Sequence, residues 1–280
     1  WYGDDHLWIV LTVASYLKET GKMELLDEVI PFYEAGKKRA DREKGTVLEH
    51  LKRSLNFTRT HLGKNKLPLL GFADWNDCMN LPLGAESSFN AGLYAKALLE
   101  MMDICETLGD TKSVKMYKGW YEDIKKAFND AAWDGKWWIR WFDKEGNAYG
   151  THKAKYGKIY CNSQSWSVMS GIAYGERAVM GMDSLNKLLN TANGVKSSTP
   201  GYRGFDGRVG GISTYPPGAK ENGGIFLHTN PWVMIAETIL GRGDKAFQYY
   251  NQINPASKNA KLDEFESEPY CYPQNILGDE

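Results

Sequence analysis

No stretch of the sequence approaches the run of about 18 apolar residues that a membrane-spanning helix requires. The first residues, WYGDDHLW, also lack the charged and then apolar pattern of a secretory signal peptide. An excess of one charge is missing too, because 34 basic residues nearly balance 35 acidic ones and the formal net charge is -1. These absences argue against a membrane or nucleic-acid partner. They leave a chain that is cytosolic or whose beginning is missing.

Paired cysteines and the common catalytic motifs are absent as well. The four cysteines form no CxxC pair, so neither a disulfide framework nor a zinc site is predicted. The sequence has no Walker or GxGxxG spacing, no GxSxG elbow and no HExxH helix. We therefore expect a reducing compartment, no metal and no organic cofactor.

Aromatic residues, by contrast, are plentiful. The chain has 10 Trp and 16 Tyr, and aromatic residues make up 13% of its 280 residues. Flat aromatic faces stack on the C–H faces of sugar rings, so this content is compatible with a carbohydrate cleft. An aromatic core is the alternative, and composition alone favours it.

Most long segments have the apolar spacing of helices, often with a capping residue at the start or a glycine at the end. One β-hairpin is predicted over residues 136–150 (KWWIRWFDKEGNAYG), with its turn at 145–147. The predicted helices cover residues 4–21, 23–36, 46–63, 87–109, 111–133, 162–182 and 231–253.

Three of these segments share one design: an apolar helix, a tight turn with glycine, and a more charged helix. The turns contain Gly21, Gly109 and Gly241, which are 88 and 132 residues apart, both multiples of 44. Repeated hairpins of an apolar inner and an amphipathic outer helix predict part of an all-α (α/α) toroid; a helical domain without repeats is the alternative. On a toroid the long loops would gather at one end, where we expect the chemistry.

The loop ADWNDCMN (residues 73–80) brings two carboxylates and an indole together. One carboxylate could be a general acid while the other sets its position or local charge. An apolar wall from Trp75 and a second aspartate would both raise the pKa of an acid here. An Asx-turn that caps the helix near residue 86 is the simpler interpretation of Asp74 and Asp77.

The stretch YPPGAKENGGIFLHTNPW (residues 215–232) is the second dense group of polar residues. Lys220, Glu221 and His228 lie on a loop that proline and glycine stiffen and that leads into a helix near Pro231. A loop with a lysine, a histidine and free amides at a helix start can bind an anion. A structural role for the single histidine is the alternative.

Two further stretches contain candidate sugar ligands. Asp4 and Asp5 begin the first predicted helix, where an N-cap role is the alternative. In NSQSWS, Gln164 and Trp166 are either sugar-binding groups or capping and core residues.

Several long motifs follow one another from the first residues to about Tyr272: YGDDHLW, GFADWNDCMNL with GAES after it, NSQSWSVMSG, YPPGAKENGGIFLHTNPW, ETILGRGDKAFQYY with INP, and SEPYCY. In this order they resemble the cellobiose and chitobiose phosphorylases, glycoside hydrolase family 94. The resemblance implies an (α/α)₆ barrel, of which residues 1–280 are a part. It places the family's N-terminal β-sandwich and C-terminal β domain outside this chain.

The resemblance also implies a reaction in which inorganic phosphate splits a β-glucosidic bond with inversion. The products are an α-sugar 1-phosphate and a shorter sugar. Because phosphate is already a nucleophile, one protein acid suffices. The match assigns that role to Asp77, with Asp74 and Trp75 shaping the site around it. It also implies that Asp4 or Asp5 binds hydroxyls of the transferred sugar.

By the same resemblance, Lys220 and Glu221 lie near the sugar subsites and His228 binds phosphate. Family members also carry a phosphate-binding arginine shortly before the DD motif and a Leu-Thr-Gly loop after the EPY motif. Neither falls within this chain. We therefore expect a catalytic-barrel fragment with an incomplete phosphate site.

Two other functions stay open at this point. An inverting hydrolase on a similar barrel needs a second catalytic carboxylate, for which Glu86, Glu221 and Glu268 are candidates. A helical sugar-binding module without catalysis is the other. For a phosphorylase we expect a cellobiose-like substrate, a cytoplasmic location that retains the charged product, and a homodimer of the full-length protein.

Overall fold

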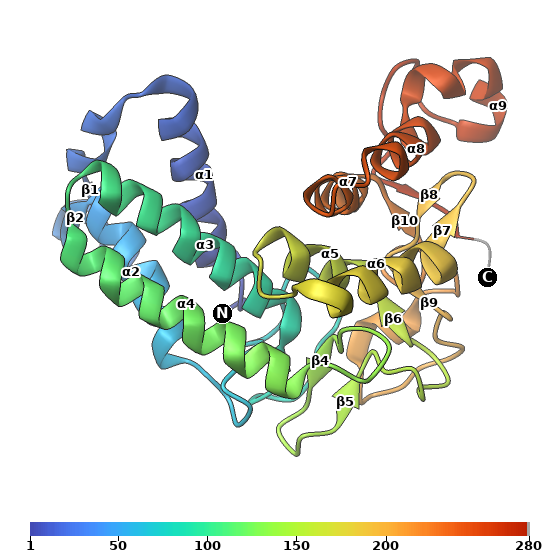
Figure 1. Ribbon diagram of the computed structural model, residues 1–280, viewed down its shortest axis with the longest axis horizontal. Helices are drawn as coiled ribbons and strands as arrows, with labels where there is room; N and C mark the ends of the chain where they lie inside the picture. The colour runs from blue at the N-terminus through green and yellow to red at the C-terminus, as the bar shows by residue number, and fades with distance from the viewer. Residues whose placement is uncertain (279–280) are drawn as a thin grey trace.

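Helical hairpins arranged as an open arc form the protein, whose computed structural model describes residues 1–278 (Figure 1). Each inner helix packs on the next, in the order α1, α3, α5 and α7, and each also packs on the helix that follows it. The arc is open between α1 and α7 in Figure 1. This arrangement confirms the predicted all-α fold, an incomplete (α/α) toroid. The pairs are α1 (Asp5–Thr20) with α2 (Val47–Thr60), α3 (Ser88–Thr107) with α4 (Thr111–Ala131), α5 (Cys161–Met169) with α6 (Gly175–Leu189), and α7 (Asn230–Ile239) with α8 (Gly243–Ile253).

The pair α3 and α4 shows why inner and outer helices differ. Helix α3 is buried on nearly all sides, because it lies between two inner neighbours and its own outer helix. Helix α4 buries only one stripe, formed by Tyr117, Tyr121, Ile124 and Phe128, and leaves its charged face in water. Within residues 1–278, every helix is too short or too polar to cross a lipid bilayer.

The predicted β-hairpin is confirmed as β4 (Trp141–Phe142) and β5 (Ala148–Tyr149), which pair antiparallel. A third strand, β3 (Glu86–Ser87), pairs with β4 and leads directly into α3. Short antiparallel pairs that the pattern did not predict also occur: β1 (Val29–Pro31) with β2 (Lys44–Thr46), β6 (Ile159–Tyr160) with β9 (Ser198–Thr199), β7 (Asn190–Thr191) with β8 (Gly194–Val195), and β10 (Ile225–Phe226) with β11 (Asn275–Ile276). Short helices complete the fold: η1 (Met23–Asp27), η2 (Arg39–Asp41), η3 (Gly210–Thr214), η4 (Leu227–Thr229), η5 (Pro255–Lys261) and α9 (Leu262–Phe265).

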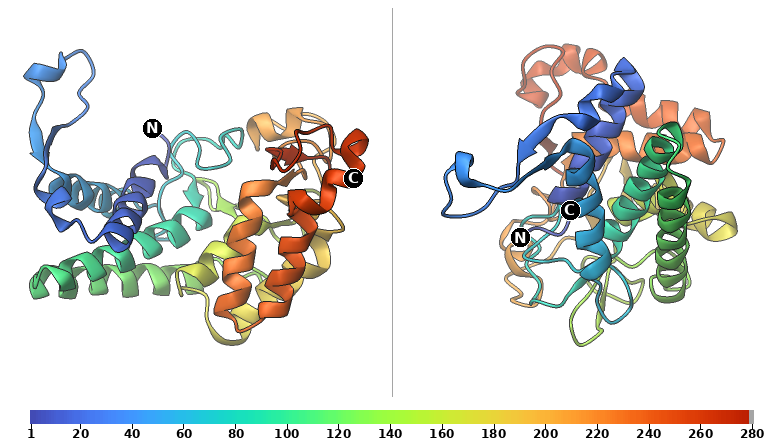
Figure 2. Two further views of the ribbon diagram at one scale, coloured as in Figure 1. Left: turned by 90° about the horizontal axis from the view of Figure 1, so that it is seen from above. Right: turned by 90° about the vertical axis from the view of Figure 1, so that its left-hand side faces the viewer.

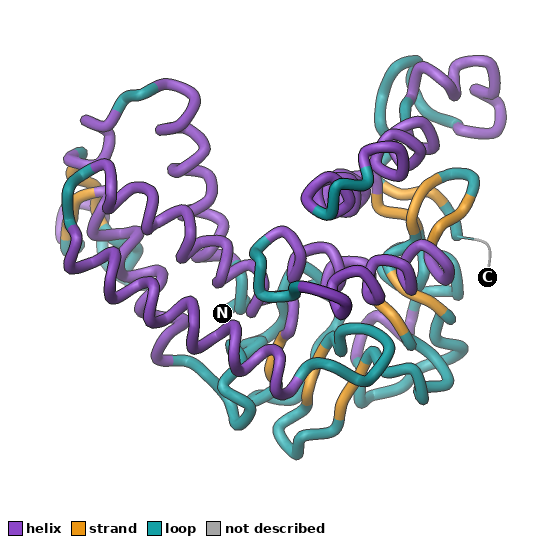
Figure 3. The backbone as a smooth tube through the Cα atoms, viewed as in Figure 1, coloured by secondary structure: helices purple, strands orange, loops and turns teal. Residues whose placement is uncertain are grey.

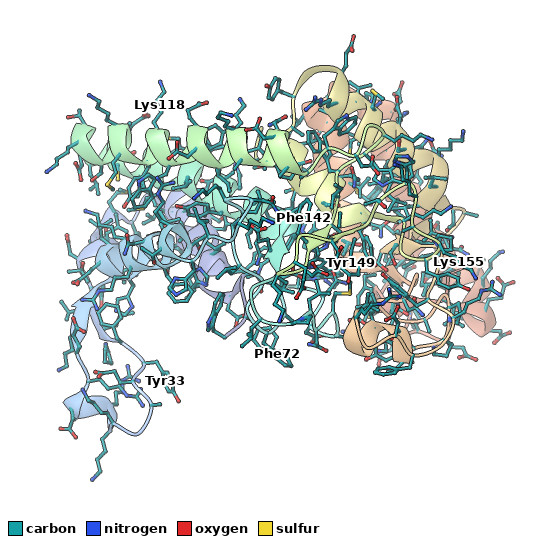
Figure 4. All side chains as sticks on the ribbon, turned by 90° about the horizontal axis from the view of Figure 1, so that it is seen from below. Tyr33, Phe72, Lys118, Phe142, Tyr149 and Lys155 are labelled. Atoms are coloured by element: carbon teal, nitrogen blue, oxygen red, sulfur yellow. The ribbon has the colours of Figure 1, made fainter. Side chains whose placement is uncertain are left out.

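The predicted helix over residues 23–36 is wrong. Only η1 forms there, and the chain then becomes the strand β1. Pro31 lacks an amide hydrogen and disfavours helical backbone in the residue before it, so an extended strand forms instead of a helix. Residues 28–46 form an arm that projects from the helices (Figure 2) and carries the exposed Tyr33 (Figure 4). The segment 162–182, predicted as one helix, also differs. Helix α5 ends at Met169, and α6 begins at Gly175 after a turn.

The long loops lie mostly along one side of the arc (Figure 3). They contain residues 61–85, 132–160 and 190–229, and they lead into the N-terminal ends of α3, α5 and α7. The loop-rich side therefore presents the starts of the inner helices, as the toroid prediction requires.

Candidate active site

An aromatic cluster forms the floor of the loop-rich side, with one ring from each inner helix. Trp8 of α1 stacks on Trp232 of α7 at 6.2 Å between ring centroids, and it meets Trp166 of α5 edge-on at 5.4 Å. Phe89 of α3 lies 6.1 Å from Trp232. The inner helices therefore converge at their N-terminal ends. The sequence shows the signal, an aromatic residue early in each inner helix, but our sequence analysis did not connect the four.

Close approach of α3 and α5 needs a glycine. A Cβ atom on Gly92 would lie 3.1 Å from Trp166, which is tighter than ordinary packing. Gly92 therefore lets the backbone of α5 at Trp166 pack closely against α3.

The loop that follows residue 70 lies over this floor and places its two aspartates differently. Asp74 is buried, and its carboxylate binds Arg140, Ser87 and the backbone amide of Asn76. Asp77 is exposed. Phe72, which is 53% exposed, projects outward from the same loop (Figure 4). The structure therefore brings Asp77 to the surface of the site and keeps the Asp74 side chain beneath it.

Trp75 connects this loop to the second predicted motif. Its indole Nε1–H donates a 2.8 Å hydrogen bond to Nε2 of His228, and its ring contacts Trp232 and Phe226. Because an indole N–H can only donate, Nε2 of His228 must accept, which leaves the imidazole proton on Nδ1. Burial among these rings lowers the pKa of His228 and favours this neutral form. His228 thus presents Nδ1–H as a donor for a ligand.

Glu221, on the loop that leads to α7, lies close to Asp77. One carboxylate oxygen of each and the Sγ atom of Cys78 lie within 4.8 Å of one another. Burial raises the pKa of Glu221, and the charge of Asp77 raises it further. Burial also raises the pKa of the Cys78 thiol, which disfavours the thiolate that a metal would need. The nearby Glu221 carboxylate raises the pKa of Tyr215, a residue in the YPPG motif that the sequence analysis did not single out.

Asp4 lies buried where α1 begins, next to the floor. Its side chain makes no capping bond and instead accepts a 2.8 Å hydrogen bond from Nε1 of Trp8. Burial raises the pKa of Asp4 to about 7, with a further contribution from the charge of Asp74. The N-cap alternative therefore does not describe this carboxyl. Asp5, the next residue, is exposed.

Three other candidates differ in burial. Gln164 is fully buried, and its amide accepts from the backbone N–H of Trp138 and donates to the carbonyl of the same residue. Lys220 is exposed on its loop. Glu86 is buried and accepts hydrogen bonds from Asn65 and Leu67. The structure pairs Trp75 with His228 and Asp77 with Glu221, and Asp4 lies buried beside the floor.

The open arc of helical hairpins, with its carboxylates above the inner helix starts, defines a domain of the (α/α)-toroid class. The chain belongs to the glycosyl hydrolase 94 superfamily, because residues 1–280 match the model of that family's catalytic domain. This confirms the family that the motifs indicate.

Individual proteins agree with this assignment. The chain is 35% identical to an N,N'-diacetylchitobiose phosphorylase of Vibrio proteolyticus, over 98% of this chain and 34% of that protein. It is 32% identical to a solabiose phosphorylase of Paenibacillus borealis, over 99% of this chain and 36% of that protein. The chain thus spans about a third of these relatives. A glycosidase structure in complex with glucose shares the fold, with a TM-score of 0.62 at 10% identity, over 99% of this chain and 57% of that one.

Proposed function

We propose that the protein containing this chain splits a β-glucosidic disaccharide or oligosaccharide with inorganic phosphate and inverts the anomeric carbon. The observation that carries the proposal is the approach of an exposed aspartate, Asp77, to Glu221, on the same loop whose Trp75 is hydrogen-bonded to His228. The relatives named above are themselves phosphorylases.

In the proposed reaction, Asp77 donates its proton to the glycosidic oxygen as the bond to the anomeric carbon breaks. A phosphate oxygen forms the new bond from the opposite face, which gives an α-sugar 1-phosphate and a sugar with a free reducing end. His228 binds phosphate through Nδ1–H. Asp4 and Asp5 hold hydroxyls of the transferred sugar, while Glu221 and Lys220 bind the leaving sugar. Phosphate is the only co-substrate.

Carboxylate spacing argues against an inverting hydrolase that would use Asp77 together with Glu221. An inverting hydrolase separates its two carboxyl groups by about 6.5–9.5 Å to hold a water molecule. Asp77 and Glu221 approach within 4.8 Å, and Glu86 is occupied by loop amides. With phosphate as nucleophile, no protein base is required, so one acid is enough.

The proposed substrate is cellobiose or a close analogue. N,N'-Diacetylchitobiose is the second candidate, because two diacetylchitobiose phosphorylases of Vibrio are 35% and 34% identical to this chain. A cytoplasmic location follows from the chemistry, because a charged sugar phosphate is retained only inside a membrane. A cleaved secretory leader on the complete protein would contradict that location.

The test is the phosphate dependence of the complete protein on a panel of cellobiose, cellodextrins, cellobionic acid and diacetylchitobiose. We expect NMR to show an α-anomeric sugar 1-phosphate that forms only when phosphate is present. Release of free sugar at the same rate without phosphate would identify a hydrolase. Binding of sugars without turnover would identify a binding module.

A further inference from the structure

A buried ion pair lies directly beneath the loop that carries Asp77. Arg140, the residue before β4, and Asp74 have no solvent-exposed side-chain surface. The two guanidinium nitrogens each donate to a different carboxylate oxygen, Nη1 to Oδ2 at 2.8 Å and Nη2 to Oδ1 at 2.6 Å. This two-point geometry fixes both the distance and the orientation of the pair.

Two aromatic rings also pack near the guanidinium of Arg140. Its central carbon lies 3.6 Å from the ring centroid of Trp141 and 5.2 Å from that of Phe89. The same two nitrogens donate to Ser87 Oγ at 3.0 Å and to Asn76 Oδ1 at 2.9 Å. Arg140 therefore connects the start of α3 with two residues of the loop.

Asp74 has no acceptor position left for a sugar. Oδ1 accepts from Arg140 and from the backbone of Asn76, and Oδ2 accepts from Arg140 and from Ser87 Oγ. Residues 72–80 form neither a helix nor a paired strand. Backbone bonds hold this loop at residues 72–73 and 78–79, and side-chain bonds at Asp74 and Asn76 hold the chain between them, up to Asp77.

We propose that Arg140 is a positioning residue for proton transfer by Asp77, acting through Asp74 and Asn76 without touching substrate. The proposal rests on the proposed function, in which Asp77 is the acid. A displacement of about 1 Å at a reacting group can cost about 10²-fold in rate. Loss of this network should therefore impair protonation of the leaving group more than sugar binding.

The experiment uses the complete protein with Arg140→Lys and with the double change Asp74→Asn/Arg140→Met. Lysine keeps the charge but cannot span two carboxylate oxygens. The double variant leaves no unpaired buried charge, which protects the fold. The matched control is Glu237→Gln/Arg242→Met, which removes a buried pair at the opposite end of α7 from His228. Cellobiose is compared with dinitrophenyl β-glucoside, whose leaving group needs no proton.

For both Arg140 variants we expect kcat on cellobiose to fall about 10- to 100-fold, with KM changed less than about 3-fold and the aryl glucoside little affected. Amide hydrogen exchange of residues 75–80 should become at least about tenfold faster, and the control should show neither change. Equal losses on both substrates, normal kinetics, or unchanged exchange of residues 75–80 would overturn the proposal. If the unmodified protein phosphorolyses no disaccharide, the proposed function fails, and the exchange result alone decides whether Arg140 holds this loop.

Discussion

The Asp4 carboxyl is buried next to the floor of the site, and its titration should affect the stability of the fold. Its pKa is raised to about 7 in the folded protein, chiefly by burial, whereas an unfolded aspartate titrates near 3.8. Between these values the folded state binds more protons than the unfolded state, so the stability contributed by Asp4 falls as pH rises from about 4 to 7. Each pKa unit corresponds to about 1.4 kcal/mol.

Asp4→Asn should therefore raise the melting temperature, and the difference from the unmodified protein should grow between about pH 4 and 7 and stay constant above. Asparagine can still accept the bond from Trp8. His6, whose pKa burial lowers to about 4, is present in both proteins and cancels in the comparison. Thermal melts across this range check the prediction, with the exposed Asp5→Asn as control. A difference that does not change with pH would contradict it.

Asp77 should show the dependence on the leaving group that a general acid requires. Asp77→Asn removes the transferable proton, so phosphorolysis of cellobiose should fall about 10²- to 10⁴-fold. Dinitrophenyl β-glucoside should be split at nearly the normal rate, because its leaving group departs without protonation. Steady-state kinetics on both substrates test this, and near-normal phosphorolysis of cellobiose by the variant would refute the assignment.

At the scale of elements, the sequence patterns predicted the helices better than they predicted the side-chain networks. Apolar periodicity and glycine turns correctly indicated the hairpins at Gly109 and Gly241, because the two helices of each are close in sequence. The hairpin predicted at Gly21 was wrong, because the outer partner of α1 is α2, which begins only at Val47. The pairing of Asp74 with Arg140, 66 positions further on, depends on the tertiary fold and left no local signal. Asp77 lies far in the sequence from Glu221 and His228, so only the motif order predicted one site for all three.

Gln164 illustrates the same limit and gives a prediction for one element. Its amide satisfies both backbone groups of Trp138, which ties α5 to the segment that enters the β4–β5 hairpin. Gln164→Ala would leave the buried N–H of Trp138 unpaired, at a cost of about 1–3 kcal/mol, whereas the carbonyl keeps its 3.3 Å bond from Ser163 Oγ. Hydrogen exchange of residues 137–142 should accelerate accordingly. Gln252→Ala is the control, because its amide oxygen has no partner within the described residues. Unchanged exchange in Gln164→Ala would show that the bonds are dispensable.

At the scale of the whole molecule, the first and last inner helices leave apolar side chains exposed. Ile9 on α1 is 51% exposed, and Ile235 and Ile239 on α7 are 44% and 54% exposed. Contiguous exposed apolar surface promotes association. The 280-residue chain expressed by itself should therefore self-associate at micromolar concentration. Ile9→Lys together with Ile239→Lys should reduce this, as measured by sedimentation velocity. A monomer at all concentrations would contradict the prediction.

The contact between Trp8 and Trp232 has a kinetic consequence. It joins residues 224 positions apart, whereas α3 and α4 are neighbours in the chain. Contacts between distant residues bear the entropy of closing a long loop and form late. During refolding, the near-UV circular dichroism of the packed indoles should recover after the far-UV helical signal, and Trp232→Phe should diminish only that slow change. The floor on which the sugar would rest is thus the last part of the molecule to become ordered.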